Sequence, residues 1–264
     1  MKKKYVSLLL LALTLIVFAF SGNVSAQNIL EDNLQISKRY NGQEGYGSSG
    51  IVDCKKYLKH KYKGSITKLL EKELDLVPIR QIDFSETWDE GNCVLVAITK
   101  MVNYYSINGD ITIKDKNLVE IYRTVKNIAV SKYRYTPETG VAMIYIKPLI
   151  EDVFKAYNCK VSVHSTSVIW NFEDDIKNQI DNDRPVIFAN SIGFGYYSEH
   201  ALLVSGYETY NVNKKRLVRP DDKKYPMIQV HDGWSYSARY IDYNKFKWEI
   251  QNLTSTIITV SIGR

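Results

Sequence analysis

The chain has 264 residues, which suits one sizeable domain or a short pro-segment followed by one domain. Its formal net charge is +6, from 35 basic and 29 acidic residues. Such a mildly basic chain gives no reason to expect a nucleic-acid partner, although it is compatible with a negatively charged cell wall.

The first 26 residues have the pattern of a secretory signal peptide. Lysines at positions 2–4 precede the apolar stretch Val6–Phe20, and the small residues Val24 and Ala26 stand before the expected cleavage site. A membrane span needs about 20 apolar residues, so this stretch is short for an anchor. No Cys follows it that could carry a lipid. We therefore expect a secreted, extracellular protein with no stable membrane anchor after cleavage, when the three lysines leave and the charge falls from +6 to +3.

Residues 27–76 are interpreted as a linker or a short pro-segment. Residues 27–50 are polar and rich in Gly and Ser, which is typical of a loose linker. Residues 51–76 carry apolar and charged residues at roughly helical spacing, so they could also form an N-terminal helix of the main domain. The main domain is then expected to occupy residues 77–264.

The first part of the main domain is predicted to be helical. From Cys93 onward, apolar residues on two adjacent lines at four-residue steps predict a helix buried against a sheet, ending near Asn108 and Gly109. Further helices are predicted over residues 116–128, 142–157 and 172–181.

The second part changes to short β-rich apolar runs bounded by turn residues. These predict strands over residues 185–189, 200–207, 227–232 and 256–260. Helices followed by strands favour an α+β fold, with helices packed beside an antiparallel sheet.

The chain has three cysteines, Cys54, Cys93 and Cys159. There is no CxxC pair and no pair of histidines at ligand spacing, so we expect no metal site. An odd number in an exported chain invites one free thiol and one disulfide. Cys54 and Cys159 would form that disulfide if Cys93 is free, provided that their Cα atoms come close enough.

Cys93 stands at the start of the predicted central helix. The N–H groups and the partial positive charge of a helix N-terminus stabilise a thiolate, so this position is expected to lower the thiol pKa. Gly91 would let a substrate backbone approach closely. The alternative is a buried structural cysteine that packs as a small apolar side chain.

Two further residues favour the catalytic interpretation. His200 opens an apolar strand directly after a polar loop, where a general base would project from a rigid element. Asp232 ends the next strand, where its carboxylate could accept a hydrogen bond from the imidazole and fix the tautomer. The order of Cys93, His200 and Asp232 predicts a catalytic triad that needs no metal or cofactor. The neighbouring His231 points to the opposite face of the strand and is interpreted as structural.

Three segments carry a resemblance to the papain-like cysteine peptidases of bacteria: Gly91-Asn92-Cys93, Arg184–Ile187 leading to Glu199–Tyr207, and Val230–Trp234. The chain is most similar to the peptidases that process bacteriocin leaders and to their exported relatives, and less similar to streptopain. The resemblance covers about residues 77–262.

The resemblance implies a papain-like α+β fold, with an N-terminal helical part packed on a C-terminal antiparallel sheet or barrel. It implies Cys93 as nucleophile, His200 as base and Asp232 as the residue that orients the base. The implied partner is a peptide or protein substrate.

The sequence departs from the family pattern at two positions. Where the family commonly has an oxyanion-binding Gln six residues before the nucleophile, this chain has Thr87, and Val94 replaces the usual Gly after the nucleophile. Gln81 could supply the missing donor only if residues 84–90 loop out. An altered oxyanion hole is therefore expected, and one lost donor typically costs about 10²–10³ in turnover.

The leading hypothesis is a secreted cysteine peptidase. A thiol acyltransferase or a cell-wall amidase would use the same triad, and a catalytically inactive papain-like domain that binds peptides is the third interpretation. Aromatic residues Phe194, Tyr196 and Tyr197 could line a substrate cleft or serve packing equally well. Because free thiols are a liability in oxidising surroundings, catalysis explains an unpaired Cys93 in an exported chain better than packing does.

Overall fold

The structure is a computed structural model. It describes residues 49–62, 64–84, 91–113, 117–167, 171–191, 197, 199–213, 223–248 and 250–263. All of them belong to the compact unit Gln43–Arg264, while the predicted signal peptide lies outside the described residues. Within the described part of the chain, no helix has both the length and the apolar composition needed to cross a membrane.

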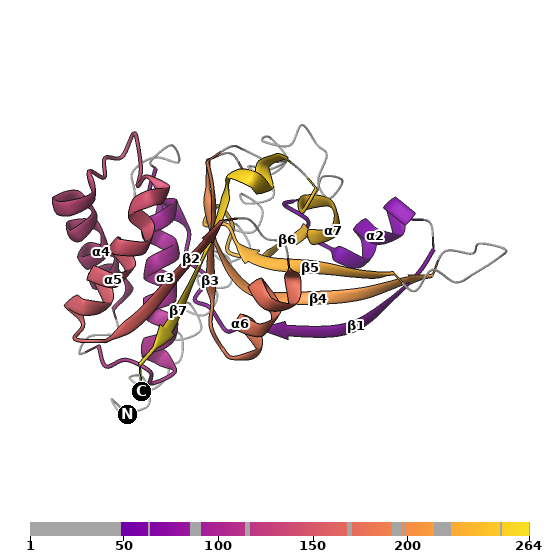
Figure 1. The fold of residues 1–264 in the computed structure, drawn as a ribbon, viewed down its shortest axis with the longest axis horizontal. Coiled ribbons are helices and arrows are strands. Elements are labelled where there is room, and N and C mark those ends of the chain that lie inside the picture. Colours follow the sequence, from indigo (N-terminus) through magenta and orange to yellow (C-terminus); the bar gives the residue numbers. More distant parts are fainter. Residues whose placement is uncertain are drawn as a thin grey trace, which may run out of the picture. The chain divides into compact units, whose positions relative to one another are not determined.

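Three long helices form one side of this unit (Figure 1). They are α3 (Cys93–Ile107), α4 (Leu118–Tyr133) and α5 (Met143–Ala156). α3 is buried almost along its whole length, as its two apolar lines predicted, and α4 and α5 pack around it. The helices predicted from Cys93 and over residues 142–157 are confirmed. The helix predicted over 116–128 is also present, but it begins and ends later, because Asn117 caps its first turn and the left-handed Arg134 ends it.

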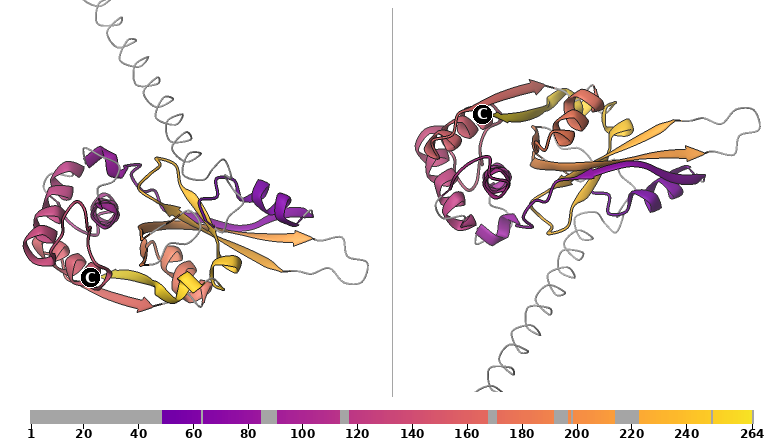
Figure 2. Two further views of the ribbon diagram at one scale, coloured as in Figure 1. Left: turned by 90° about the horizontal axis from the view of Figure 1, so that it is seen from above. Right: turned by 90° about the horizontal axis from the view of Figure 1, so that it is seen from below.

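Seven antiparallel strands form one sheet with the order β2-β7-β3-β4-β5-β6, and β1 pairs with β4 off this path. The bounds are β1 Ser65–Glu73, β2 Val161–Ser167, β3 Val186–Asn190, β4 Ala201–Asn213, β5 Lys224–His231, β6 Arg239–Asp242 and β7 Ser255–Ile262. Figure 2 shows β4 and β5 extending away from the helices, with β1 alongside. The predicted α+β fold with an antiparallel sheet is confirmed, although β1, β2 and β6 escaped prediction.

Short elements complete the unit. They are α2 (Cys54–Tyr62), α6 (Asn178–Asp181), α7 (Tyr243–Phe246), the 3-10 turns η1 (Gln81–Phe84) and η3 (Ile250–Thr254), and the π-helical turn η2 (Glu173–Lys177). η2 and α6 together take the place of the helix predicted over 172–181.

The single helix considered for residues 51–76 is wrong, because this stretch forms α2 and then β1. α2 packs Cys54, Tyr57 and Leu58 into an apolar cluster with side chains from β4 and β5. β1 is exposed on both faces at most positions, so it lacks the strict alternation that marks a half-buried strand. Its order comes from pairing with β4, a partner more than 130 residues away.

The disulfide considered between Cys54 and Cys159 is also wrong, because all three cysteines are free thiols. Cys54 begins α2, which packs against the β4–β5 arm, whereas Cys159 lies between α5 and β2. Figure 1 shows these elements at opposite ends of the sheet. Burial raises the pKa of both thiols.

Gly206 lies where β1, β4 and β5 meet, opposite Glu73 on one side and Gln229 on the other. A Cβ here would stand 2.4 Å from both Lys72 O and Gln229 Oε1. Because the first of these is backbone, Gly206→Ala should lower the free energy of unfolding by about 1–3 kcal/mol. Urea denaturation measures this, with Gly263→Ala as the control, because a Cβ on Gly263 would stand 3.5 Å from its nearest neighbour, Lys160 O. Equal stability of the two variants would contradict the packing described.

Candidate active site

Cys93 is the first residue of α3, and the backbone before it is tightly held. Gly91 N–H donates to Pro137 O at 2.6 Å, and a Cβ on Gly91 would lie 2.8 Å from Gly140 N. The expectation that Gly91 leaves room for a substrate backbone is therefore wrong, since the chain's own 137–140 turn occupies that space. Gly91 serves to fix the start of α3.

The thiol of Cys93 faces the start of β4. The main-chain N–H groups of Ala201, of Val94 and of Cys93 itself lie near the sulfur and act to lower the pKa of the thiol. Burial acts more strongly in the other direction, so the net pKa of Cys93 is raised. The expected lowering by the helix N-terminus is present as a contribution but is outweighed by desolvation. Ala201 follows His200, so Cys93 and His200 lie on adjoining elements.

His200 is buried, and its ring and backbone are both held. Asn190 N–H donates to His200 O at 3.1 Å, which ties the residue to β3. The ring Nε2 lies 2.6 Å from the main-chain O of Asp232. Trp234 stacks on the imidazole with ring centroids 4.1 Å apart, and Tyr197 lies parallel at 5.9 Å. Since a carbonyl oxygen only accepts, Nε2 carries the hydrogen, and Nδ1 of the neutral ring is the basic nitrogen.

Asp232 is fully buried, but its carboxylate is used differently from the prediction. Oδ1 accepts from Trp234 N–H at 2.9 Å and Ser235 N–H at 3.0 Å, and Oδ2 has no hydrogen-bond partner among the described residues. The imidazole of His200 is therefore oriented by the carbonyl of Asp232, while the carboxylate shapes the turn. Burial raises the pKa of Asp232, and the Arg239 cation and the two N–H groups oppose that rise.

Gln81 lies within this site. Its N–H donates to Gly233 O at 2.7 Å, and its O accepts from Asn92 Nδ2 at 3.1 Å, directly before Cys93. Its side-chain Oε1 accepts from Trp234 Nε1 at 3.2 Å, so the amide nitrogen is the donor end. η1 thus links the turn after β5 to the start of α3. The looped segment that this placement requires falls on residues 85–90, outside the described residues.

Three buried or partly buried residues shape the site, although the sequence analysis assigned no role to them. Asn92 bonds both Gln81 O and Tyr122 Oη. Asn190, at the end of β3, accepts from His200 N–H with its side chain and donates its own N–H to His200 O. Trp234 stacks on the His200 ring. A polar residue at the end of an apolar strand was the available signal for Asn190, but it is shared by many turns.

Of the residues named from the sequence as oxyanion or cleft candidates, Thr87, Phe194 and Tyr196 lie outside the described residues. Tyr197 is fully buried and packs against both His200 and Trp234, so it belongs to the packing around the imidazole.

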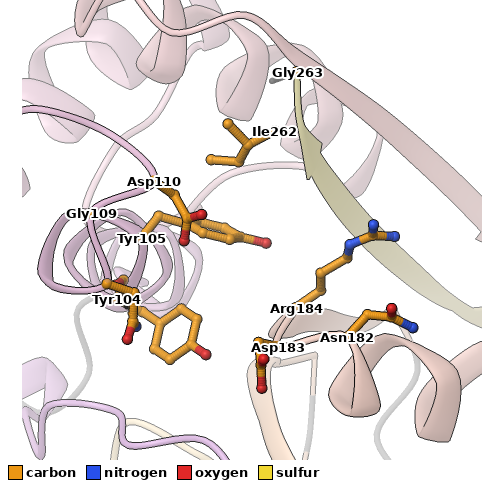
Figure 3. Close-up of a pocket in the computed structure, with 10 residues that line it drawn as sticks. Tyr104, Tyr105, Gly109, Asp110, Asn182, Asp183, Arg184, Ile262 and Gly263 are labelled. Carbon is orange, nitrogen blue, oxygen red and sulfur yellow. Dashed lines mark hydrogen bonds between the residues drawn. The ribbon is translucent and has the colours of Figure 1, made fainter.

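A separate polar cavity of about 1020 Å³ lies at the other end of α3 (Figure 3). Tyr104 and Tyr105 line it from the last turn of the helix, and Asp183 and Arg184 line it from the connection before β3. Because Cys93 begins the same helix, this cavity is distinct from the site around the thiol.

This unit has an α+β fold, a cysteine at the first position of its central helix, and a buried histidine directly before the adjoining strand. These features place it in the class of papain-like cysteine peptidase folds. The chain belongs to the Peptidase_C39 like family, whose model matches residues 73–254. This family is papain-like, and membership in it supports a peptidase. No curated protein matches the chain.

His231 is buried, and its Nδ1 lies 3.3 Å from Lys100 Nζ. Burial first, and the Lys100 charge second, hold the pKa of His231 well below 6.5. The unfolded chain therefore binds a proton below about pH 6.5 that the folded protein does not, so His231 costs stability progressively as the pH falls below that value.

When the pH falls from 6.5 to 5, the free energy of unfolding should therefore decrease less in His231→Gln than in wild type. The difference between the two decreases should reach up to about 2 kcal/mol. Urea denaturation across this pH range measures it. His164→Gln, at an exposed position on β2, should keep the wild-type pH dependence. Identical pH dependence in wild type and His231→Gln would contradict a neutral buried His231.

Proposed function

We propose that the protein is a secreted cysteine peptidase in which Cys93 is the nucleophile and His200 the general base. The observation that supports this most is the hydrogen bond from His200 Nε2 to Asp232 O. This bond leaves Nδ1 as the ring nitrogen that can accept a proton. His200 also directly precedes Ala201, whose main-chain N–H acts to lower the pKa of the Cys93 thiol.

In the proposed reaction, His200 Nδ1 takes the thiol proton as the Cys93 sulfur attacks the substrate carbonyl. Because burial raises the pKa of the thiol, the free thiolate is scarce and its formation depends on the imidazole. The resulting imidazolium protonates the leaving amine, and the amine departs. His200 then activates a water that releases the acyl group and restores the thiol.

The oxyanion of the tetrahedral intermediate would be held by the Cys93 N–H and the amide N–H of Gln81. Gln81 is fixed on both sides, by Asn92 before the nucleophile and by Trp234 beside the base. This placement supports Gln81 as the replacement for the Gln that the family has nearer the nucleophile, where this chain has Thr87.

The proposal includes export through residues 1–26 and action outside the cell, with no cofactor. Pairing of β1 with β4 and packing of α2 support a mature form that retains both elements. A pro-segment within residues 27–76 would then end before α2, and the mass of the secreted protein reports where the chain begins.

The function is tested with the secreted protein, a peptide library and a thiol-directed probe. Wild type should cleave peptides and be labelled at Cys93, and Cys93→Ala should do neither while keeping its thermal midpoint. Cys159→Ser removes the other partly exposed thiol and should leave cleavage unchanged. A wild-type protein that neither cleaves nor labels would overturn the proposal, whereas amine incorporation would point to acyl transfer and stem-peptide release to an amidase.

The oxyanion role of Gln81 is tested by two substitutions. Gln81→Ala should lower kcat by about 10²–10³ because one donor is lost. Gln81→Glu keeps an acceptor for Trp234 Nε1 but no donor, so it should be as slow as Gln81→Ala. Steady-state kinetics with a cleaved peptide measures both. A Glu variant that turns over at the wild-type rate would show that Gln81 only supports Trp234.

A further inference from the structure

The polar cavity at the C-terminal end of α3 lies apart from the thiol and takes no part in the proposed reaction. Tyr104, which lines it, follows Cys93 by eleven residues, or about 16 Å along the helix axis. A second cavity of about 430 Å³ adjoins it, because Asp110, Ile262 and Gly263 line both. The two cavities together make an elongated hollow.

Tyr104 has a buried side chain whose hydroxyl has no structural task. Only 6% of the residue is exposed, and its Oη makes no hydrogen bond among the described residues, although buried tyrosine hydroxyls usually find a partner. The next residue differs, since Tyr105 Oη donates to Val260 O at 3.1 Å. A phenylalanine at position 104 would make the same contacts within the protein, so the hydroxyl is free to bind a ligand in the cavity.

Arg184 lines the cavity from the opposite side and is also without a partner. It is half-buried, and its guanidinium makes no hydrogen bond or ion pair within the described part of the chain. In Figure 3 the hydroxyls of Tyr104 and Tyr105 point from α3 toward the segment that carries Arg184. The cavity therefore separates groups that can bind a ligand from both sides.

The charges around the cavity restrict what can fill it. The Asp183 carboxylate pairs with Lys72 at 2.7 Å, which leaves the Asp110 carboxylate and the Arg184 guanidinium as the unpaired charges among the described lining residues. A ligand with several charges of one sign, such as a polyphosphate or a polyamine, would meet one group of its own sign. The lining therefore fits a ligand with no net charge.

The hydrogen-bonding groups restrict the ligand further. Tyr104 and Arg184 offer donors, and burial raises the pKa of Tyr104 to about 12, so its hydroxyl keeps its hydrogen. Tyr105 has its hydrogen on Val260 O and offers only an acceptor, as does Asp110. A matching ligand must both donate and accept along its length. Hydroxyl groups do both, and a saccharide carries several on each ring.

We propose that this cavity binds a neutral oligosaccharide. Tyr104 and Arg184 donate to its hydroxyl groups, and Tyr105 and Asp110 accept from them. The chain continues past Asp110 into the adjoining cavity, which Cys159 lines. Because the site lies at the far end of α3 from Cys93, it holds the protein on a glycan without occupying the place of a peptide substrate. The inference is independent of the proposed function.

The test is titration calorimetry of the whole secreted protein with three neutral sugars, cellotetraose, maltotetraose and chitotetraose. At least one should bind with a Kd of about 1 mM or below, and Tyr104→Phe and Arg184→Gln should each weaken it about tenfold, the effect of one lost hydrogen bond. Tripolyphosphate, spermidine and an uncharged blocked tripeptide are titrated in parallel. If none of the three sugars binds, or if Tyr104-dependent binding is confined to these other compounds, the proposal is overturned.

Matched variants separate the cavity from the rest of the surface. Tyr145→Phe removes a half-buried hydroxyl on α5, and Arg123→Gln removes an exposed guanidinium on α4, both outside the two cavities. Both variants should bind sugar as wild type does. Because the Tyr104 hydroxyl has no partner within the described protein, Tyr104→Phe should keep the wild-type thermal midpoint. Equal loss of binding in Tyr145→Phe and Tyr104→Phe would contradict a site at this cavity.

Cys159 reports on the adjoining cavity. In a Cys93→Ala background, a saturating tetrasaccharide should slow alkylation of Cys159 by iodoacetamide, since Cys54 is buried. Unchanged alkylation with sugar bound would overturn the continuation into that cavity. Co-sedimentation with insoluble cellulose and chitin distinguishes a polymer from a free oligosaccharide as the source of the ligand.

Peptide cleavage separates this inference from the proposed function. Cys93→Ala should bind sugar as wild type does, and Tyr104→Phe should cleave peptides at the wild-type rate. A protein that binds a tetrasaccharide but cleaves no peptide would end the proposed function and leave this inference standing. A protein that cleaves peptides but binds none of the three sugars would end this inference alone.

Discussion

The contact between the N-terminus of α3 and the start of β4 is the constraint on which the site depends. The Ala201 N–H acts there to lower the pKa of the Cys93 thiol, and the residue before Ala201 is His200. Two further contacts hold the ends of these two elements in place. Gly91 packs against Gly140 to fix the start of the helix, and Asn190 pairs with His200 to fix the start of the strand.

A second connection runs through the turn after β5 and makes the site one polar unit. The turn presents a carbonyl to His200, a ring over the imidazole and an oxygen to the Gln81 N–H. Gln81 in turn is held by Asn92 next to the nucleophile. Because the groups are buried, each hydrogen bond is costly to leave unmade, so loss of one should disturb several others. The carboxylate of Asp232 holds this turn by accepting from the N–H groups of Trp234 and Ser235.

The sequence predicted the parts of the fold that rest on local patterns. Strong apolar periodicity identified α3, and short apolar runs identified β3, β4, β5 and β7. β1 was missed because its exposed residues carry no alternation and its order comes from distant pairing. The short β6 carries too few residues to stand out from the turn before it.

The same limit applies to the site. Cys93, His200 and Asp232 became candidates because of their places at the ends of elements, and their catalytic roles stay a prediction. In Asp232 the main-chain carbonyl contacts the imidazole and the carboxylate contacts the turn. The spacing of residues in a sequence does not reveal which of the two groups makes which contact. The direction of the Cys93 pKa was predicted wrongly for a related reason. The helix N-terminus can be read from sequence, but the burial that outweighs it depends on how α3 and β4 pack.

The central claim is that His200 is what makes the Cys93 thiol reactive. The most direct measurement is the rate of Cys93 alkylation against pH in wild type and His200→Ala, both carrying Cys159→Ser. We predict that wild type reacts from mildly acidic pH upward, whereas His200→Ala reacts only at alkaline pH because burial raises the thiol pKa. Superimposable profiles for the two proteins would contradict the account.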